Sequence, residues 1–217
     1  MAVAQATSRE AGATKRRNPT EEAILECVIA MIDERGEAGV RIADITAATK
    51  ASISSIYHFF HDREGLIAAA QAERYYRALG GSVEMVSIMA SRATSRADLR
   101  SAILQLIEWM ARPERAPHRL TRINVMGATL GRPVLRDRVA EIQDQVVLEQ
   151  SKVYEDLQAR GLMRSDVDPI TMSAFVMGMI LSRSVTEIGP SSASQEEWTR
   201  LTIMVTDELF FGDEKLD

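Results

Sequence analysis

The side chains best suited to catalysis or metal binding are few and scattered in this sequence. It contains three histidines, His58, His61 and His118, and a single cysteine, Cys27. We find no His, Asp and Glu spacing typical of a metal site, no glycine-rich phosphate loop and no plausible nucleophile–base–acid triad. The sequence therefore predicts no catalytic residue, no metal and no cofactor, and it argues against an enzyme.

A cluster of short polar and aromatic side chains offers a different chemistry. Its members are Ser52, Ser54, Ser55, Tyr57 and His58. Serine hydroxyls permit close approach to phosphate oxygens or base edges, and the polar tips of tyrosine and histidine suit phosphate. Ile53 has two interpretations that the sequence leaves open, a contact to a thymine methyl group or an ordinary exposed apolar residue.

These residues need helices to position them, and the local sequence predicts such helices. Asn18-Pro19 provides an N-cap and a first-turn proline, and the helix that follows should end at the glycines Gly36 and Gly39. Two short helices are expected over about 41–49 and 52–59, joined tightly around Lys50. Helices of this length are marginal alone, so their pairing predicts a helix-turn-helix whose second member enters the major groove.

The segment from Ile45 to Leu66 resembles the DNA-binding signature of the TetR family of repressors. The strongest matches are Ile56-Tyr57-His58-Phe59-Phe60 and Asp62-Arg63-Glu64-Gly65-Leu66. The resemblance covers about residues 20–70, and the rest of the chain matches only in its helical layout. It implies a ligand-binding and dimerising domain beyond about residue 70.

Two positions depart from the family pattern. Lys50 stands where the family usually has a turn glycine, and it could tolerate backbone strain or add a phosphate contact. Arg41 stands where the family often has threonine, which removes a helix cap and offers a cation to phosphate. Arg63 is a further expected phosphate contact. The full set of expected DNA-binding residues is Arg41, Lys50, Ser52, Ile53, Ser54, Ser55, Tyr57, His58 and Arg63.

The charge of the chain gives this interpretation no support. The net charge is −5, which disfavours indiscriminate binding to nucleic acid. Residues 1–17 form an expected flexible basic arm that is either a solvated tail or a contact to phosphate or the minor groove. Cys27 is expected to be a buried thiol. With no apolar run at the start and no membrane span, we expect a cytoplasmic protein.

The remainder of the chain also shows helical periodicity, and no alternating strand pattern occurs. The fold class is therefore all-α. The helix-turn-helix domain is expected over 18–66, and the family resemblance implies a ligand-binding and dimerisation domain over 67–217. Pro113 and Pro117 interrupt the helical pattern. Gly161 ends a long helix that is marked by apolar residues from Leu135 to Leu157.

The helices expected around 169–188 and 194–211 predict a homodimer. The first of these is expected to begin at Asp168-Pro169, in the same way as the helix at Asn18-Pro19. It is apolar on almost every side, so one face can cover its own core and another a partner. Ala174, Gly178 and Ser182 are small residues at four-residue spacing, which permits close helix approach. The second helix begins at a capping box, Ser194 with Glu197. Together they predict a two-fold four-helix interface.

The effector is the least defined part of the interpretation. Candidate cavity residues are Met89, Trp109, Met110, Met126 and Tyr154. At helical spacing such residues belong to a core more often than to a pocket. His118, Arg119 and Arg122 could receive an acidic ligand, although a solvated or interface face is the favoured interpretation.

The leading hypothesis is a ligand-responsive transcriptional regulator. It would be a repressor that binds a palindromic operator in double-stranded DNA as a homodimer and is released by an unknown small molecule. The alternative is a helical module that binds small molecules or proteins without binding DNA.

Overall fold

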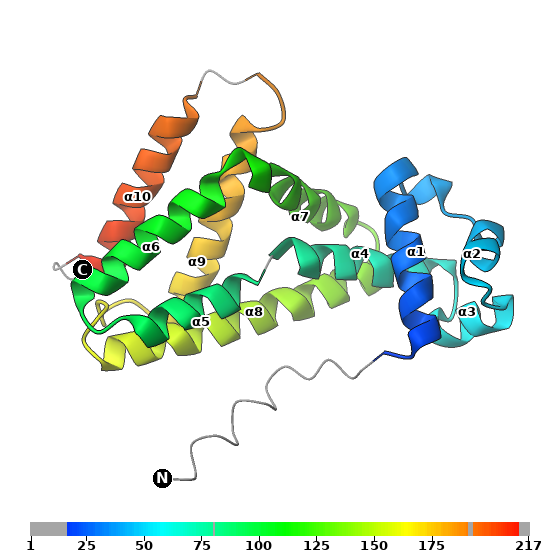
Figure 1. The fold of residues 1–217 in the computed structure, drawn as a ribbon, viewed down its shortest axis with the longest axis horizontal. Helices are drawn as coiled ribbons and strands as arrows, with labels where there is room; N and C mark the ends of the chain where they lie inside the picture. The colour runs from blue at the N-terminus through cyan, green and yellow to red at the C-terminus, as the bar shows by residue number, and fades with distance from the viewer. Residues whose placement is uncertain (1–16, 80, 191–192, 213–217) are drawn as a thin grey trace, which may run out of the picture. The chain divides into compact units, whose positions relative to one another are not determined.

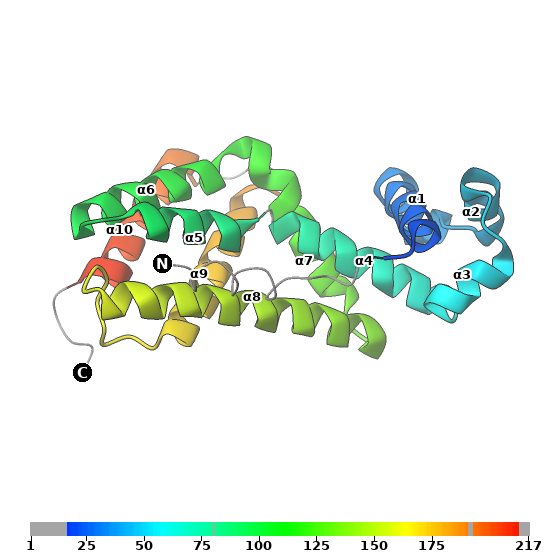
Figure 2. The same ribbon diagram turned by 60° about the horizontal axis from the view of Figure 1, so that its bottom comes forward.

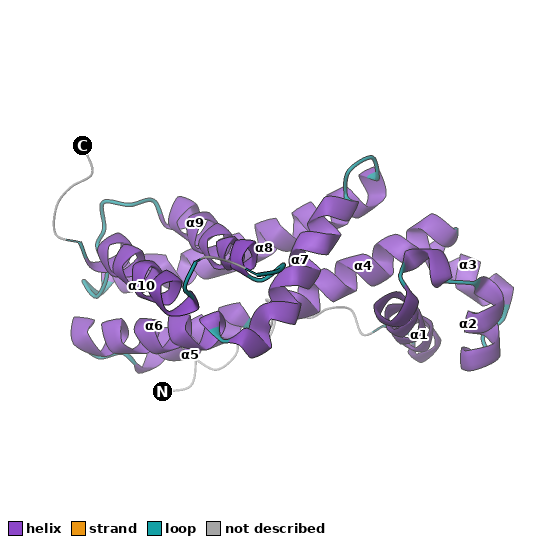
Figure 3. Cartoon of the chain, turned by 90° about the horizontal axis from the view of Figure 1, so that it is seen from above, coloured by secondary structure: helices purple, strands orange, loops and turns teal. Residues whose placement is uncertain are grey.

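The computed structural model describes residues 17–79, 81–190 and 193–212. Most of the expected arm, residues 1–16, therefore lies outside the described residues. Every regular element in the described residues is a helix, in agreement with the expected all-α class (Figure 3). The chain divides into two compact units, one up to Gln71 and one from Ala72 onward, and the boundary lies within one helix.

The first unit contains three complete helices and the start of a fourth. They are α1 (Pro19–Arg35), α2 (Ile42–Thr49), α3 (Ile53–Phe60) and α4 (Arg63–Leu79), with a short 3-10 turn, η1 (Glu37–Gly39), before α2 (Figure 1). The predicted cap is present, because Asn18 accepts a hydrogen bond from the Thr20 amide at 2.9 Å. The helix ends at Arg35, and Gly36 follows with a φ of 74°.

Apolar side chains from all four helices form the core of the first unit. Ile24 and Val28 of α1, Ile45 of α2 and Ile56 of α3 are completely buried. Leu66, on the first part of α4, is also completely buried in this cluster. Cys27 is half-buried against this core rather than fully enclosed, and burial raises the pKa of its thiol.

The second unit contains the last part of α4 and six further helices. These are α5 (Ser82–Arg92), α6 (Arg96–Ala111), α7 (Ala116–Ala128), α8 (Pro133–Ala159), α9 (Pro169–Ser182) and α10 (Gln195–Phe211), with 3-10 turns η2 (Pro113–Arg115) and η3 (Arg183–Thr186). Helix α8 packs along α5 and α9, and α10 packs along α6 (Figures 1 and 2). Their apolar faces meet in one core around Leu99, Leu106, Leu157 and Phe210.

The predicted helix starts in this unit carry their caps. The Asp168 carboxylate accepts from the Thr171 amide at 2.7 Å, and the hydrogen bond with Thr171 lowers the pKa of Asp168. Ser194 accepts from the Glu197 amide at 3.3 Å and begins α10. The capping bonds thus satisfy first-turn amides and, together with burial of the apolar faces, determine where these helices begin.

One boundary differs from its prediction. The helix expected to continue to about residue 188 ends as an α-helix at Ser182 and narrows into η3. Its apolar pattern continues, but Arg183 is almost fully buried there and forms an ion pair with Glu187. The tighter turn brings this charged pair inward, which an apolar repeat alone does not indicate.

The described helices include none with the length and hydropathy that a bilayer crossing requires.

Candidate functional site

The turn between α2 and α3 is formed by a lysine in a left-handed conformation. Lys50 has φ 61° and ψ 9°, and its amide donates to the Thr46 carbonyl at 3.0 Å, which ends α2. The Thr49 hydroxyl donates to Ile45 and accepts from the Ala51 amide, so the turn is closed on both sides. The predicted conflict between a lysine and a glycine-type conformation is therefore present in the structure.

Helix α3 begins at a serine cap. The Ser52 hydroxyl oxygen accepts from the Ser55 amide at 3.0 Å, and the two serine hydroxyls lie 2.8 Å apart. Ser52 and Ser55 thus stabilise the start of the helix, and both Ser52 and Ser54 are exposed. The cap fixes where the first residues of α3 stand relative to α2.

The two sides of α3 differ sharply. Ile56 is completely buried and Phe60 nearly so, whereas Ile53 is 55% exposed and Tyr57 41% exposed. Ser54 and His58 are exposed as well. Residues 53, 54, 57 and 58 occupy one face by helical spacing. Five of the nine expected DNA-binding residues therefore lie on α3, four of them on this face, and Ser52 is the N-cap of the helix.

Arg63 has a structural role that the sequence did not indicate. Its Nη2 donates to the carbonyl of Glu37 at 3.0 Å and to that of Val40 at 3.3 Å. Gln71 donates to the Glu37 carboxylate at 2.5 Å. These bonds attach α4 to η1, so part of the Arg63 guanidinium group already has hydrogen-bond partners within the protein. Arg41 and Lys50, by contrast, are exposed.

A tight turn at His61 connects α3 to α4. His61 has φ 67° and ψ −56°, and the Asp62 amide donates to the Phe60 carbonyl at 2.8 Å, which defines a strained γ-turn. Asp62 then accepts from the Gly65 amide at 2.7 Å. A Cβ at Gly65 would lie 2.2 Å from the Phe60 carbonyl oxygen, so the turn requires glycine at this position.

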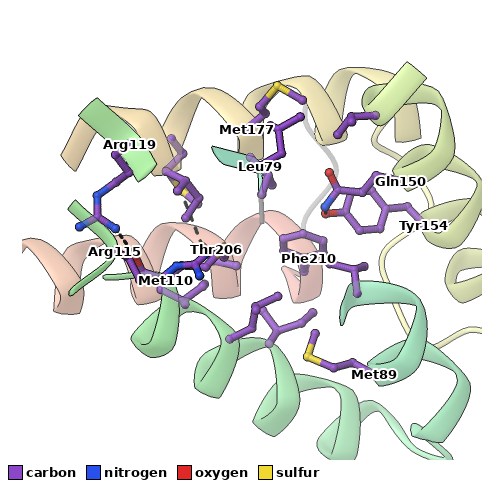
Figure 4. Close-up of a pocket in the computed structure, with 18 of the residues that line it drawn as sticks. Leu79, Met89, Met110, Arg115, Arg119, Gln150, Tyr154, Met177, Thr206 and Phe210 are labelled. Atoms are coloured by element: carbon purple, nitrogen blue, oxygen red, sulfur yellow. Dashed lines mark hydrogen bonds between the residues drawn. The ribbon is translucent and has the colours of Figure 1, made fainter. Parts of the chain in front are cut away.

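A cavity lies among the helices of the second unit. It encloses a volume of about 90 Å³, and its walls come from α4, α5, α6, η2, α7, α8, α9 and α10. Most of its lining is aliphatic or methionine, and Arg115 and Arg119 lie at the opposite end from Gln150, Tyr154 and Phe210 (Figure 4). The cavity is thus an apolar chamber with a basic end.

Three of the five candidate cavity residues line this chamber, namely Met89, Met110 and Tyr154. Trp109 and Met126 do not. Trp109 directly precedes Met110 on α6 but lies on a different side of that helix, where the Arg115 guanidinium is 3.9 Å from its ring centroid. Met126 is 37% exposed on α7. Helical periodicity alone could not separate these faces, because several helices surround the cavity.

A buried ion cluster closes the basic end. Arg119 and Glu187 are each 3% exposed in their side chains and form a bidentate pair, with Arg119 Nε donating to Oε2 at 2.8 Å and Nη2 to Oε1. Arg183 lies 3.3 Å from the same carboxylate. Arg119 also donates to the carbonyls of Met110 and Arg112. Arg119 is therefore buried and satisfied, and the solvated face favoured from the sequence is wrong for it.

Arg122 and His118 complete the basic end. Arg122 is only 6% exposed, which likewise contradicts a solvated face. Burial lowers the pKa of Arg122, and Tyr75, whose ring centroid lies 5.9 Å away, opposes that shift. Burial and the charges of Arg115 and Arg119 lower the pKa of His118, which favours its neutral form. The sequence does contain a signal for this basic cluster, because residues 115, 118, 119 and 122 have the spacing that places them on one face of a helix.

A polar network occupies the other end of the cavity. Gln150 donates to the Tyr154 hydroxyl at 2.8 Å and accepts from the Ser173 hydroxyl at 3.1 Å. Burial raises the pKa of Tyr154 well above its ordinary value, so the phenol stays protonated. Both ends of the chamber therefore present fixed polar groups to whatever occupies it.

Comparison with solved structures identifies the fold, although no protein-family model and no curated protein matches the sequence. A protein from Rhodococcus sp. described as a TetR-family transcriptional regulator is 22% identical and has a TM-score of 0.63, with 88% of this chain and 97% of that chain covered. Another so described, from Mesorhizobium loti, is 16% identical with a TM-score of 0.64 over 88% and 96%. Salmonella enterica GusR is 17% identical with a TM-score of 0.61 over 91% and 98%. The fold is that of the TetR-family transcriptional regulators, as the resemblance implied.

Proposed function

We propose that this protein is a ligand-responsive transcriptional regulator that binds DNA through α3. The observation that carries the proposal is the exposed face of that helix, defined by Ile53, Ser54, Tyr57 and His58. The opposite face of the helix is anchored in the core, so the exposed side chains are held on a rigid support. A helix of this kind fits the major groove.

The exposed side chains divide into base contacts and phosphate contacts. Ile53 and Ser54 lie near the start of α3, where a recognition helix approaches base edges most closely, and Ile53 suits a thymine methyl group. Tyr57, His58, Lys50 and Arg41 suit phosphate oxygens. Arg63 acts mainly as a positioning residue in this proposal, because its guanidinium is bonded to η1.

The proposal includes a homodimer formed through α9 and α10. Exposed apolar side chains lie on both helices, including Ile170, Phe175, Leu201 and Met204. Ala174, Gly178 and Ser182 are also exposed, which would allow a partner helix to approach closely. Exposed apolar surface of this kind marks an interaction site, and a two-fold arrangement would match a palindromic operator.

Repression and release form the final part of the proposal. A dimer can contact two half-sites only when its two α3 helices stand about 34–36 Å apart or at a multiple of that spacing. A small molecule in the cavity would release DNA if it binds better to a dimer with a different spacing. The cavity of the second unit supports this role, because it is apolar with convergent polar groups.

The test begins with selection of bound duplexes from a randomised pool, followed by fluorescence anisotropy on the selected sequence at several salt concentrations. We expect an enriched palindrome and a dimer by sedimentation. Tyr57→Ala should weaken binding on all sequences, and Ile53→Ala should relax preference at one base position. Tyr76→Ala is the matched control, because Tyr76 is an exposed helical tyrosine outside the first unit.

The outcomes distinguish a DNA-binding regulator from a helical module that binds small molecules or proteins without binding DNA. Loss of affinity in the Tyr57 variant with no loss in the Tyr76 variant would support the assigned interface. Equal affinity of the wild type for every duplex in the pool, or no binding, would refute a sequence-specific regulator and leave the ligand-binding module as the function.

A further inference from the structure

The cavity of the second unit contains two arginines in contrasting states. Arg119 and Arg122 are one helical turn apart on α7, and both line the cavity. Arg119 presents its Nε and Nη2 edge to Glu187 and so forms the side-on bidentate pair that guanidinium and carboxylate groups favour. Its charge is therefore balanced within the protein.

Arg122 presents the same edge without a partner. Its Nε and Nη2 atoms are buried and have no hydrogen-bond partner in the described part of the chain. A guanidinium stays charged even where burial lowers its pKa, because its ordinary pKa is above about 12. A buried charge without an opposite charge is destabilising, so an anion facing Arg122 would stabilise this site.

The rest of the cavity restricts what that anion can be. Between the basic end and the Gln150–Tyr154 end, the lining is aliphatic, aromatic or thioether except for Thr206 (Figure 4). The Thr206 hydroxyl donates to the Thr202 carbonyl at 2.8 Å. A volume of about 90 Å³ is smaller than the cavity of about 150 Å³ that holds benzene. Met89, Met110, Met177 and Met179 line it, and methionine side chains can rearrange to admit a longer chain.

We infer that the cavity binds a small amphipathic carboxylate, whose carboxylate pairs with the Nε and Nη2 edge of Arg122 and whose apolar body lies against the methionines. The arrangement at Arg122 then repeats the one that Glu187 forms with Arg119. This inference rests on the proposed function, since it names the chemical class of the effector for that cavity.

Calorimetric titration of the full chain tests the inference without DNA. The probes are straight-chain carboxylates of four to ten carbons, each compared with the primary amide of the same length. We expect at least one carboxylate to bind at least tenfold more tightly than its amide, and tenfold corresponds to about 1.4 kcal/mol. Arg122→Met should reduce that ratio to near one, and Arg122→Lys should leave an intermediate value because lysine keeps the charge without the fork.

Two further measurements make every outcome decisive. Arg138→Met, at an exposed position on α8, is the matched control and should leave the ratio unchanged. Without ligand, Arg122→Met should be at least as stable to heat as the wild type, because it removes an uncompensated buried charge. Marked destabilisation by Arg122→Met would instead indicate a structural arginine and overturn the inference. Amides that bind as tightly as carboxylates, or no binding by any carboxylate up to 10 mM (about −2.7 kcal/mol), would also overturn it.

The proposed function and this inference can fail separately. Selective carboxylate binding by a chain that binds no DNA would retain the anion site and remove the regulator. Sequence-specific DNA binding with no preference for carboxylates would do the reverse.

Discussion

Replacing Lys50 with glycine separates the two roles that this residue has in the turn between α2 and α3. Lys50 is exposed and has a positive φ of 61°. A left-handed conformation costs a non-glycine residue about 1–2 kcal/mol. Glycine avoids that cost but loses about 0.5–1 kcal/mol through the greater freedom of the unfolded chain. Lys50→Gly should therefore stabilise the protein by about 0.5–1 kcal/mol.

The magnitude is measurable, and a second variant isolates its cause. One kcal/mol raises the melting temperature of a chain of this size by about 2–4 °C, so we expect Lys50→Gly to raise it by about 1–4 °C. Lys50→Ala also removes the charge but keeps the left-handed strain, so it should give no such gain. If the two variants are equally stabilised in thermal and urea denaturation, loss of charge repulsion rather than backbone strain is the cause and our argument is refuted.

The same pair of variants tests the proposed phosphate contact. Each lost phosphate contact lowers the slope of log affinity against log salt by about 0.9. Both Lys50→Gly and Lys50→Ala should show that decrease, since each removes the ammonium group. An unchanged slope in both variants would remove Lys50 from the interface, whatever its effect on stability.

Two further substitutions probe the packing of each unit. Gly65→Ala should destabilise the first unit by about 1–3 kcal/mol, because the new Cβ would stand 2.2 Å from the Phe60 carbonyl oxygen, and urea denaturation measures the loss. Glu187→Gln should cost about 3–5 kcal/mol, because it leaves the charges of Arg119 and Arg183 buried without a carboxylate, and the same assay measures it.

Each substitution has a matched control in the same chain. A Cβ at Gly127 on α7 meets nothing within 4 Å, so Gly127→Ala should be neutral or slightly stabilising. Glu155 is an exposed glutamate on α8, so Glu155→Gln should change stability by less than about 0.5 kcal/mol. A Gly65 variant as stable as the Gly127 variant would show that the γ-turn relaxes freely.

Local sequence signals predicted most of the helices, because a helix start depends on a few neighbouring residues. Asn18, Asp168 and Ser194 each accept from an amide two or three residues ahead, so their capping role follows from sequence spacing alone. The reversal of φ at Lys50 also followed from a local pattern. The end of α9 did not, because burial of Arg183 depends on a distant ion cluster.

The cavity shows the limit of such reasoning more clearly. Periodicity places a residue on one side of its helix, but it does not say which neighbouring helix covers that side. Met110 and Trp109 are adjacent in sequence, yet only Met110 lines the cavity. The charges of Arg119 and Arg122 favour a solvated or interface face, but an ion pair with Glu187, which is distant in sequence, makes burial of Arg119 possible. Charge type alone is therefore a weak predictor of exposure, since Arg122 is buried as well, although its Nε and Nη2 atoms have no hydrogen-bond partner among the described residues.

The bonds from Arg63 and Gln71 to Glu37 limit how the first unit can be separated from the rest of the chain. A fragment ending at Asp62 would contain all of α3 but neither residue that ties α4 to η1. A fragment ending at residue 66 would keep Arg63 and lose Gln71. A DNA-binding unit that is excised or transferred to another protein must therefore include α4 at least through Gln71. The smallest fragment that keeps these bonds is thus longer than the helix-turn-helix formed by α2 and α3.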